Sequence, residues 1–157
     1  MSKIRSKTIQ GLQVGDTFII SRQFTETDMQ KFADITRDYN AVHFDSRFAH
    51  AKNFRGRICH GLLVGSLLTE IGGQIGWLAS VMNYRFKQPV YFNETITCKF
   101  IINHIDERRR AKATALYFNP DGDLVLEAEL EGILPDETER QILNEMVREG
   151  DPTNKVH

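Results

Sequence analysis

Near the middle of the chain the sequence reads Gly61-Leu62-Leu63-Val64-Gly65-Ser66-Leu67-Leu68-Thr69-Glu70-Ile71-Gly72-Gly73-Gln74-Ile75-Gly76-Trp77. A helix built from this run is apolar on almost every side, which is typical of a helix buried in a core. Its small residues allow other parts of the chain to approach the helix closely. The pattern predicts a central helix from about Gly61 to Ile71 or one turn further, because Gly72-Gly73 would end or bend it.

Strand-like segments flank this helix on both sides. They are rich in β-branched and aromatic residues and cover Thr17–Phe24 before the helix, then Val81–Phe86, Thr95–His104, Ala111–Phe118 and Asp123–Leu134 after it. The turn signal Asn119-Pro120-Asp121-Gly122 predicts an antiparallel hairpin between the last two. The economical assembly is an α+β fold in which an antiparallel sheet of five or more strands wraps around one long central helix.

Helical signals also surround the first polar motif. Thr25, with Asp28 three residues later, resembles a capping box and predicts a helix from about Glu26 to Arg37. A shorter helix is expected from Ser46 to Ala51. From Pro135 the chain turns polar and acidic, and a short amphipathic helix is expected there before a frayed end. We therefore expect one domain over residues 1–157, with its core at about 12–134 and a polar tail at about 135–157.

Composition excludes several classes of protein. The chain has 157 residues, 20 basic and 21 acidic, and a net charge of -1, so no global field favours nucleic acid or an anionic membrane as a partner. No run approaches the roughly 18 apolar residues of a membrane span, and the charged N-terminus is not followed by a signal-type segment. Cys59 and Cys98 lack the spacing of a disulfide framework or a structural zinc site. A cytoplasmic enzyme or binding protein is the expectation.

One carboxylate and one imidazole stand close together in Asp38-Tyr39-Asn40-Ala41-Val42-His43. Their ordinary pKa values of about 3.9 and 6.5 suit an acid/base pair that shares one substrate or one water. The spacing alone is common, and in the alternative Asp38 caps a turn while His43 is an exposed loop residue. The predicted helix at Gly61 adds unpaired N–H groups that can stabilise an oxyanion.

Two longer segments carry a family resemblance. They are Phe32-Ala33-Asp34-Ile35-Thr36-Arg37-Asp38-Tyr39-Asn40-Ala41-Val42-His43-Phe44-Asp45 and Arg57-Ile58-Cys59-His60-Gly61-Leu62-Leu63-Val64-Gly65-Ser66. Together they resemble the MaoC-like family of R-specific enoyl-CoA hydratases, whose signature is D-x-N-P-x-H followed by H-G-x-L-x-x-S. The run from Tyr84 to Val90, with Glu94-Thr95 after it, is similar to a strand of that family. One departure is Ala41, which replaces a proline that would stiffen the loop.

The resemblance implies a hot dog fold and reversible hydration of a trans-2-enoyl-CoA to an (R)-3-hydroxyacyl-CoA. It implies Asp38 and His43 as the catalytic pair and the Gly61 N–H as oxyanion donor. Asn40, His60 and Ser66 are expected beside the substrate. It implies no metal and no cofactor, and an active site near the interface of a homodimer or of a dimer of dimers.

The basic residues Arg55, Arg57, Arg85 and Lys87 are candidates to meet the phosphates of coenzyme A. The aromatic residues Phe54, Trp77, Phe86 and Tyr91 are candidates to line an acyl pocket. Three alternative functions stay open: a dehydratase acting on a carrier-protein thioester, a hot dog thioesterase with Asp38 as its carboxylate, and a non-catalytic acyl-CoA-binding protein. The length of the acyl chain is not predicted.

Overall fold

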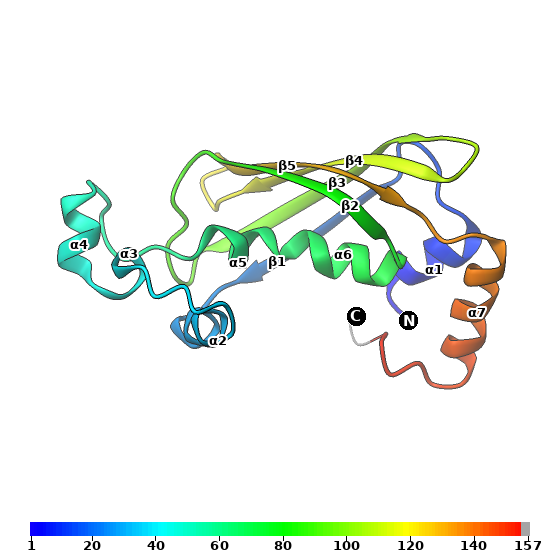
Figure 1. The fold of residues 1–157 in the computed structure, drawn as a ribbon, viewed down its shortest axis with the longest axis horizontal. Coiled ribbons are helices and arrows are strands. Elements are labelled where there is room, and N and C mark those ends of the chain that lie inside the picture. The colour runs from blue at the N-terminus through cyan, green and yellow to red at the C-terminus, as the bar shows by residue number, and fades with distance from the viewer. Residues whose placement is uncertain (155–157) are drawn as a thin grey trace.

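The computed structural model describes residues 1–154 of the chain (Figure 1). The helices are α1 (Lys3–Gln10), α2 (Glu26–Thr36), α3 (Ala41–Phe44), α4 (Ser46–Ala51), α5 (Gly61–Gly65), α6 (Leu67–Ile75) and α7 (Glu137–Arg148). The strands are β1 (Thr17–Gln23), β2 (Leu78–Phe86), β3 (Thr95–Ile105), β4 (Arg110–Phe118) and β5 (Leu124–Ile133).

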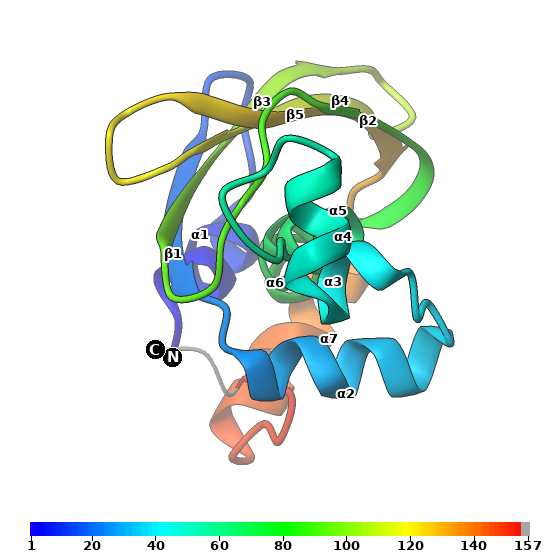
Figure 2. The ribbon, with the colours of Figure 1, turned by 90° about the vertical axis from the view of Figure 1, so that its left-hand side faces the viewer.

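The five strands form one antiparallel sheet in the order β1-β3-β4-β5-β2. Figure 2 shows this sheet arched over α5 and α6, with α2 on the opposite side of the helices. The predicted hairpin joins β4 to β5, where the Asn119 side chain accepts hydrogen bonds from Asp121 and Asp123. The predicted hot dog arrangement, an α+β fold with the sheet around a central helix, is confirmed.

The central helix is interrupted once, at a position that differs from the prediction. Ser66 separates α5 from α6 and keeps right-handed helical dihedrals, so the two pieces follow one path. The expected bend at Gly72-Gly73 is wrong, because α6 continues through both glycines. It ends at Gly76, which takes the left-handed conformation with φ of 76°.

Strand β2 packs its aromatic side chains directly onto the glycines of the central helix. A Cβ atom added to Gly61 would lie 2.5 Å from the Phe86 ring, and one added to Gly65 would lie 2.9 Å from the Tyr84 ring. The two rings stack on each other with centroids 6.0 Å apart. Glycine is therefore required at these helix positions for the close approach of β2.

The sheet turns one face to the helix. Alternate residues of β3 are fully buried, namely Ile96, Cys98, Phe100 and Ile102, and they pack against buried residues of α6 such as Leu68 and Ile71. The Tyr117 hydroxyl donates a 2.8 Å hydrogen bond to the Gly65 carbonyl, which fixes β4 to the central helix. The start of the helix is thus held at a defined place under the sheet.

Two features at the chain ends differ from the prediction. Helix α1 was not expected, although Ser2 caps it. The tail holds the expected amphipathic helix, α7, but its end is not frayed as far as Asn154. A terminal cluster forms there: Ser2 bonds Gln74 and Asn154, and the Arg5 and Asp151 side chains, both almost fully buried, lie 3.6 Å apart. Residues 155–157 of the predicted tail lie outside the described residues.

None of the helices in residues 1–154 has both the length and the apolar character needed to cross a membrane.

Candidate active site

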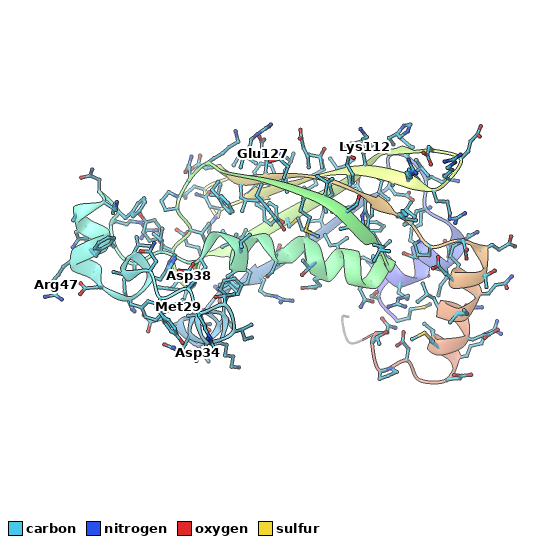
Figure 3. The ribbon with its side chains drawn as sticks, viewed as in Figure 1. Met29, Asp34, Asp38, Arg47, Lys112 and Glu127 are labelled. Atoms are coloured by element: carbon cyan, nitrogen blue, oxygen red, sulfur yellow. The ribbon has the colours of Figure 1, made fainter. Side chains whose placement is uncertain are left out.

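Asp38 is placed by the end of α2. The predicted helix is confirmed, with a complete capping box between Thr25 and Asp28. Arg37 then takes the left-handed conformation, with φ of 59°, and turns the chain sharply. Asp38 follows in the loop before α3, near the start of α5 (Figure 3). Its side chain is 49% exposed, so the carboxylate can meet a ligand from outside.

His43 lies in a short helix and not in an exposed loop. Asn40 caps α3 by accepting a hydrogen bond from the Val42 amide. The His43 side chain is buried, and its Nδ1 lies 2.8 Å from the Ile58 carbonyl oxygen. A carbonyl only accepts, so Nδ1 carries the proton and Nε2 keeps a free lone pair. The alternative of His43 as an exposed loop residue is wrong.

The carboxylate and the imidazole face each other. Nε2 of His43 lies 4.0 Å from Oδ2 of Asp38. Burial lowers the pKa of His43 below its usual 6.5, the bond to the Ile58 carbonyl raises it, and nearby His60 lowers it further while Asp38 raises it. The net direction is downward, so at neutral pH His43 is a neutral base.

His60 is a third ring in this site. Its side chain is 1% exposed, and its ring stacks on that of His43 with centroids 3.7 Å apart. Its Nε2 lies 2.9 Å from the Asp38 carbonyl oxygen, so this nitrogen donates the hydrogen bond. We expected His60 to lie beside the substrate, but its ring is buried against the ring of His43.

Asp38, His43 and His60 offer oxygen and nitrogen atoms within 4.8 Å of one another, a grouping that resembles a cation site. The donor set argues against that use. Nε2 of His60 holds its proton toward the Asp38 carbonyl, and Nδ1 of His43 holds one toward Ile58. This leaves one free imidazole lone pair directed at one carboxylate, which suits a water or a substrate proton.

Gly61 begins α5 directly after His60. The first N–H groups of a helix have no partner within the helix, and they are positive in partial charge. Because Gly61 directly follows His60, the start of α5 lies one residue from the ring that stacks on His43. Ser66 is more distant, since its hydroxyl donates to the Leu63 carbonyl at the junction of α5 and α6.

The four candidate phosphate ligands all have acidic partners within the chain. Arg55 pairs with Glu94 at 2.7 Å and lies 3.7 Å above the Tyr91 ring. Arg57 pairs with Glu26. Arg85 and Lys87 both pair with Glu127 on β5, at 3.3 and 3.4 Å. Sequence reasoning missed these acidic partners because they come from distant segments.

An apolar groove of about 260 Å³ lies between α6 and β2, and Leu68, Gly72, Gly73, Trp77, Met82 and Phe100 line it. Among the four aromatic candidates for an acyl pocket, Trp77 lines this groove and Phe86 covers Gly61. The Tyr91 ring instead lies beneath the Arg55 guanidinium.

Cys59 does not act as a nucleophile in this geometry. Its side chain is buried, and burial together with the nearby charges of Glu94 and Asp28 raises its pKa to about 12. A thiol with this pKa stays protonated at neutral pH.

Comparisons with known proteins agree with this fold. Residues 13–118 match the family described as MaoC like domain. An (R)-specific enoyl-CoA hydratase of Aeromonas caviae is 29% identical over 131 residues, covering 80% of this chain and 98% of the relative. A solved structure of the A. caviae (R)-hydratase matches with a TM-score of 0.75 over 80% of this chain and 99% of its own.

Two further relatives carry other substrates in their names. A mitochondrial 3-hydroxyacyl-[acyl-carrier-protein] dehydratase of Arabidopsis thaliana is 33% identical over 97 residues, and the match covers 60% of this chain and only 57% of that enzyme. A 3-hydroxybutyryl-CoA dehydratase of Methylorubrum extorquens is 29% identical over 119 residues, covering 71% of this chain and 74% of the relative.

The fold and these relatives define a class of enzyme, the hydro-lyases with a hot dog fold. Within that class the chain belongs to the MaoC-like family of hydratases and dehydratases.

Proposed function

We propose that the protein is an R-specific enoyl-CoA hydratase, which adds water reversibly to a trans-2-enoyl-CoA to give an (R)-3-hydroxyacyl-CoA. The observation that carries the proposal is the 4.0 Å separation of His43 Nε2 from Asp38 Oδ2. This distance is too long for a direct hydrogen bond, but one water can bond both atoms when they lie about 4 to 5 Å apart. The R configuration is supported by the names of relatives such as the (R)-specific enoyl-CoA hydratase of Aeromonas caviae.

In the proposed reaction the thioester carbonyl oxygen accepts hydrogen bonds at the first turn of α5, where Gly61 leaves the backbone open. This polarises the enoyl group, so that C3 becomes electrophilic and the enolate charge is stabilised. His43 Nε2 takes a proton from the water as its oxygen bonds to C3. Asp38 orients the water, and the proton taken up by His43 then passes to C2 with Asp38 taking part in the transfer, so that OH and H of one water are added in all. The reverse dehydration uses the same groups.

Two further parts of the proposal concern the ligand. The acyl chain would follow the central helix toward the groove at Trp77, which begins at Leu68, about two helical turns after Gly61. The exposed guanidinium of Arg55 would meet a phosphate of coenzyme A. A dehydratase acting on a carrier-protein thioester is the second candidate, because the Arabidopsis relative acts on that carrier by its name.

The test is hydration of crotonyl-CoA by the purified protein, followed by absorbance, with chiral analysis of the product. We expect (R)-3-hydroxybutyryl-CoA. Asp38→Asn and His43→Ala should each lower kcat/KM by at least about 10²-fold, because each removes a positioned acid/base group. Circular dichroism checks that both variants are folded.

The result also separates the rivals. Release of free coenzyme A without hydration would identify a thioesterase, and binding without turnover would identify an acyl-CoA-binding protein. Folded Asp38→Asn or His43→Ala protein with wild-type kcat/KM would refute the assigned mechanism.

A further inference from the structure

His60 is an unusual choice of side chain for its surroundings. The ring is buried and packs against aromatic rings on several sides, those of His43, Phe32 and Phe44. Its Nδ1 is buried and has no hydrogen-bond partner among the described residues. A phenylalanine would fill the same space without leaving a polar atom unpaired, and an unpaired buried polar atom lowers stability. The imidazole must therefore contribute something that an apolar ring does not.

That contribution is made by Nε2. It donates a 2.9 Å hydrogen bond to the Asp38 carbonyl and lies 3.9 Å from the Asp38 carboxylate. Asp38 stands in a loop whose own hydrogen bonds are short-range, from its amide to Thr36 and from the Asn40 amide to its carboxylate. His60 thus ties this exposed loop to the buried start of α5, across 22 positions of sequence.

The second contact is with the base. The His60 and His43 rings lie nearly parallel, at 27°, with centroids 3.7 Å apart. His43 is held at its other end by the Ile58 carbonyl. One hydrogen bond and one stacked ring therefore fix the plane of His43, and Asp38 and His60 are the ionisable side chains that act on it.

We propose that His60 is a positioning residue: its Nε2–H holds the Asp38 backbone while its ring holds the His43 ring, so that carboxylate and base keep the separation that one water can span. The proposal rests on the proposed hydratase function. His60 itself touches neither the water nor the substrate in this arrangement. It acts through both catalytic groups at once.

Two substitutions separate the two contacts. His60→Phe keeps a ring against His43 and removes the donor to Asp38. His60→Gln keeps an N–H donor at a similar reach and removes the ring. Phe32→Leu is the matched control. Phe32 packs against His60 with centroids 5.1 Å apart, but its side chain neither donates a hydrogen bond to Asp38 nor stacks on the His43 ring.

With crotonyl-CoA we expect His60→Phe to lower kcat by about 10-fold or more with KM within about twofold, because displacing a catalytic group by a fraction of an ångström acts on the chemical step. His60→Gln should recover only part of that loss, because it keeps a donor to Asp38 but leaves the His43 ring without its stacked partner. Both variants should move the acid limb of kcat/KM to higher pH, because His60 lowers the pKa of His43 and its removal lets that pKa rise. Phe32→Leu should change neither quantity more than about twofold. Wild-type kcat in His60→Phe, or the same loss in Phe32→Leu, would overturn the proposal.

A measurement without turnover keeps this test independent of the hydratase assignment. Nitrogen NMR of the wild-type protein at neutral pH should show the His60 proton on Nε2 and the His43 proton on Nδ1. A His60 proton on Nδ1 alone would remove the bond to Asp38 and refute the positioning role. A wild-type protein with these tautomers and no hydratase activity would refute the proposed function and leave the positioning of Asp38 and His43 standing.

Discussion

At the scale of single residues, the two side chains proposed as the catalytic pair differ strongly in burial. The His43 side chain is 8% exposed and that of Asp38 is 49% exposed. Burial disfavours the charged imidazolium, so His43 holds its free lone pair into mildly acidic solution. The Asp38 carboxylate is in contact with solvent and is therefore accessible to water and to a substrate.

This difference predicts the pH dependence of the reaction. His43 loses its base form when it is protonated, and its pKa is lowered, so kcat/KM should stay constant on the acid side until the pH falls below about 6.5. The measurement should use a crotonyl thioester of pantetheine, because the phosphate of coenzyme A itself titrates near pH 6. An acid limb above pH 7 would contradict the role of His43.

At the scale of elements, the contact of β2 with the central helix fixes the place of Gly61, the proposed oxyanion donor. Because a Cβ at residue 61 would meet the Phe86 ring, Gly61→Ala should displace either the ring or the helix start. We expect kcat/KM to fall about 10-fold or more. Adding Phe86→Ala should restore part of the activity, since the clash is removed. Kinetics of the double-mutant cycle measure this coupling, and independent losses would show that the clash is not the cause.

The loop between α4 and α5 carries a separate prediction about the carrier. Arg55→Ala should raise KM for enoyl-CoA and spare kcat, because a remote phosphate contact acts equally on ground and transition states. The effect should shrink as salt rises. Arg108→Ala, in the exposed turn before β4, is the matched charge control and should change nothing. Equal losses on a thioester without the nucleotide would show that Arg55 shapes the pocket instead.

The sequence predicts elements well where a pattern repeats within them. All five strands and α2, α4 and α7 were predictable from periodicity, caps and turn residues. Helix α1 was not, because Lys3-Ile4-Arg5-Ser6-Lys7-Thr8-Ile9-Gln10 has too few apolar residues to show a helical period. The break at Ser66 was also missed, since the apolar pattern runs through it without a change.

The site shows the same limit. Motifs indicated Asp38, His43 and Gly61, and the structure brings the first two together and places Gly61 next to the His60 ring that stacks on His43. The stacking of His60 on His43 and the acidic partners of the arginines depend on contacts between distant segments. No local spacing encodes such contacts.

At the scale of the whole molecule, β2 is an open edge of the sheet. Its apolar residues Leu78, Val81, Met82 and Phe86 are all exposed in this chain, which is unfavourable in water. We predict a homodimer, or a dimer of dimers, in which two copies pair through this edge. Val81→Lys should give monomers by light scattering, while Ile19→Lys on the opposite edge strand should not. A stable, active wild-type monomer would refute the prediction.

The terminal cluster has a consequence for how the protein is made. Ser2 and Asn154, which bond each other, are separated by 152 positions. A ribosome that adds about 5 to 20 residues per second needs about 8 to 30 s to cover that distance. Late in this interval α1 and residues 13–118, which match the family, have been synthesised, while Asn154 and Asp151, which contact Ser2 and Arg5, have still to be added. Helix α1, which precedes the other described helices along the chain, is thus among the last to gain all of its contacts.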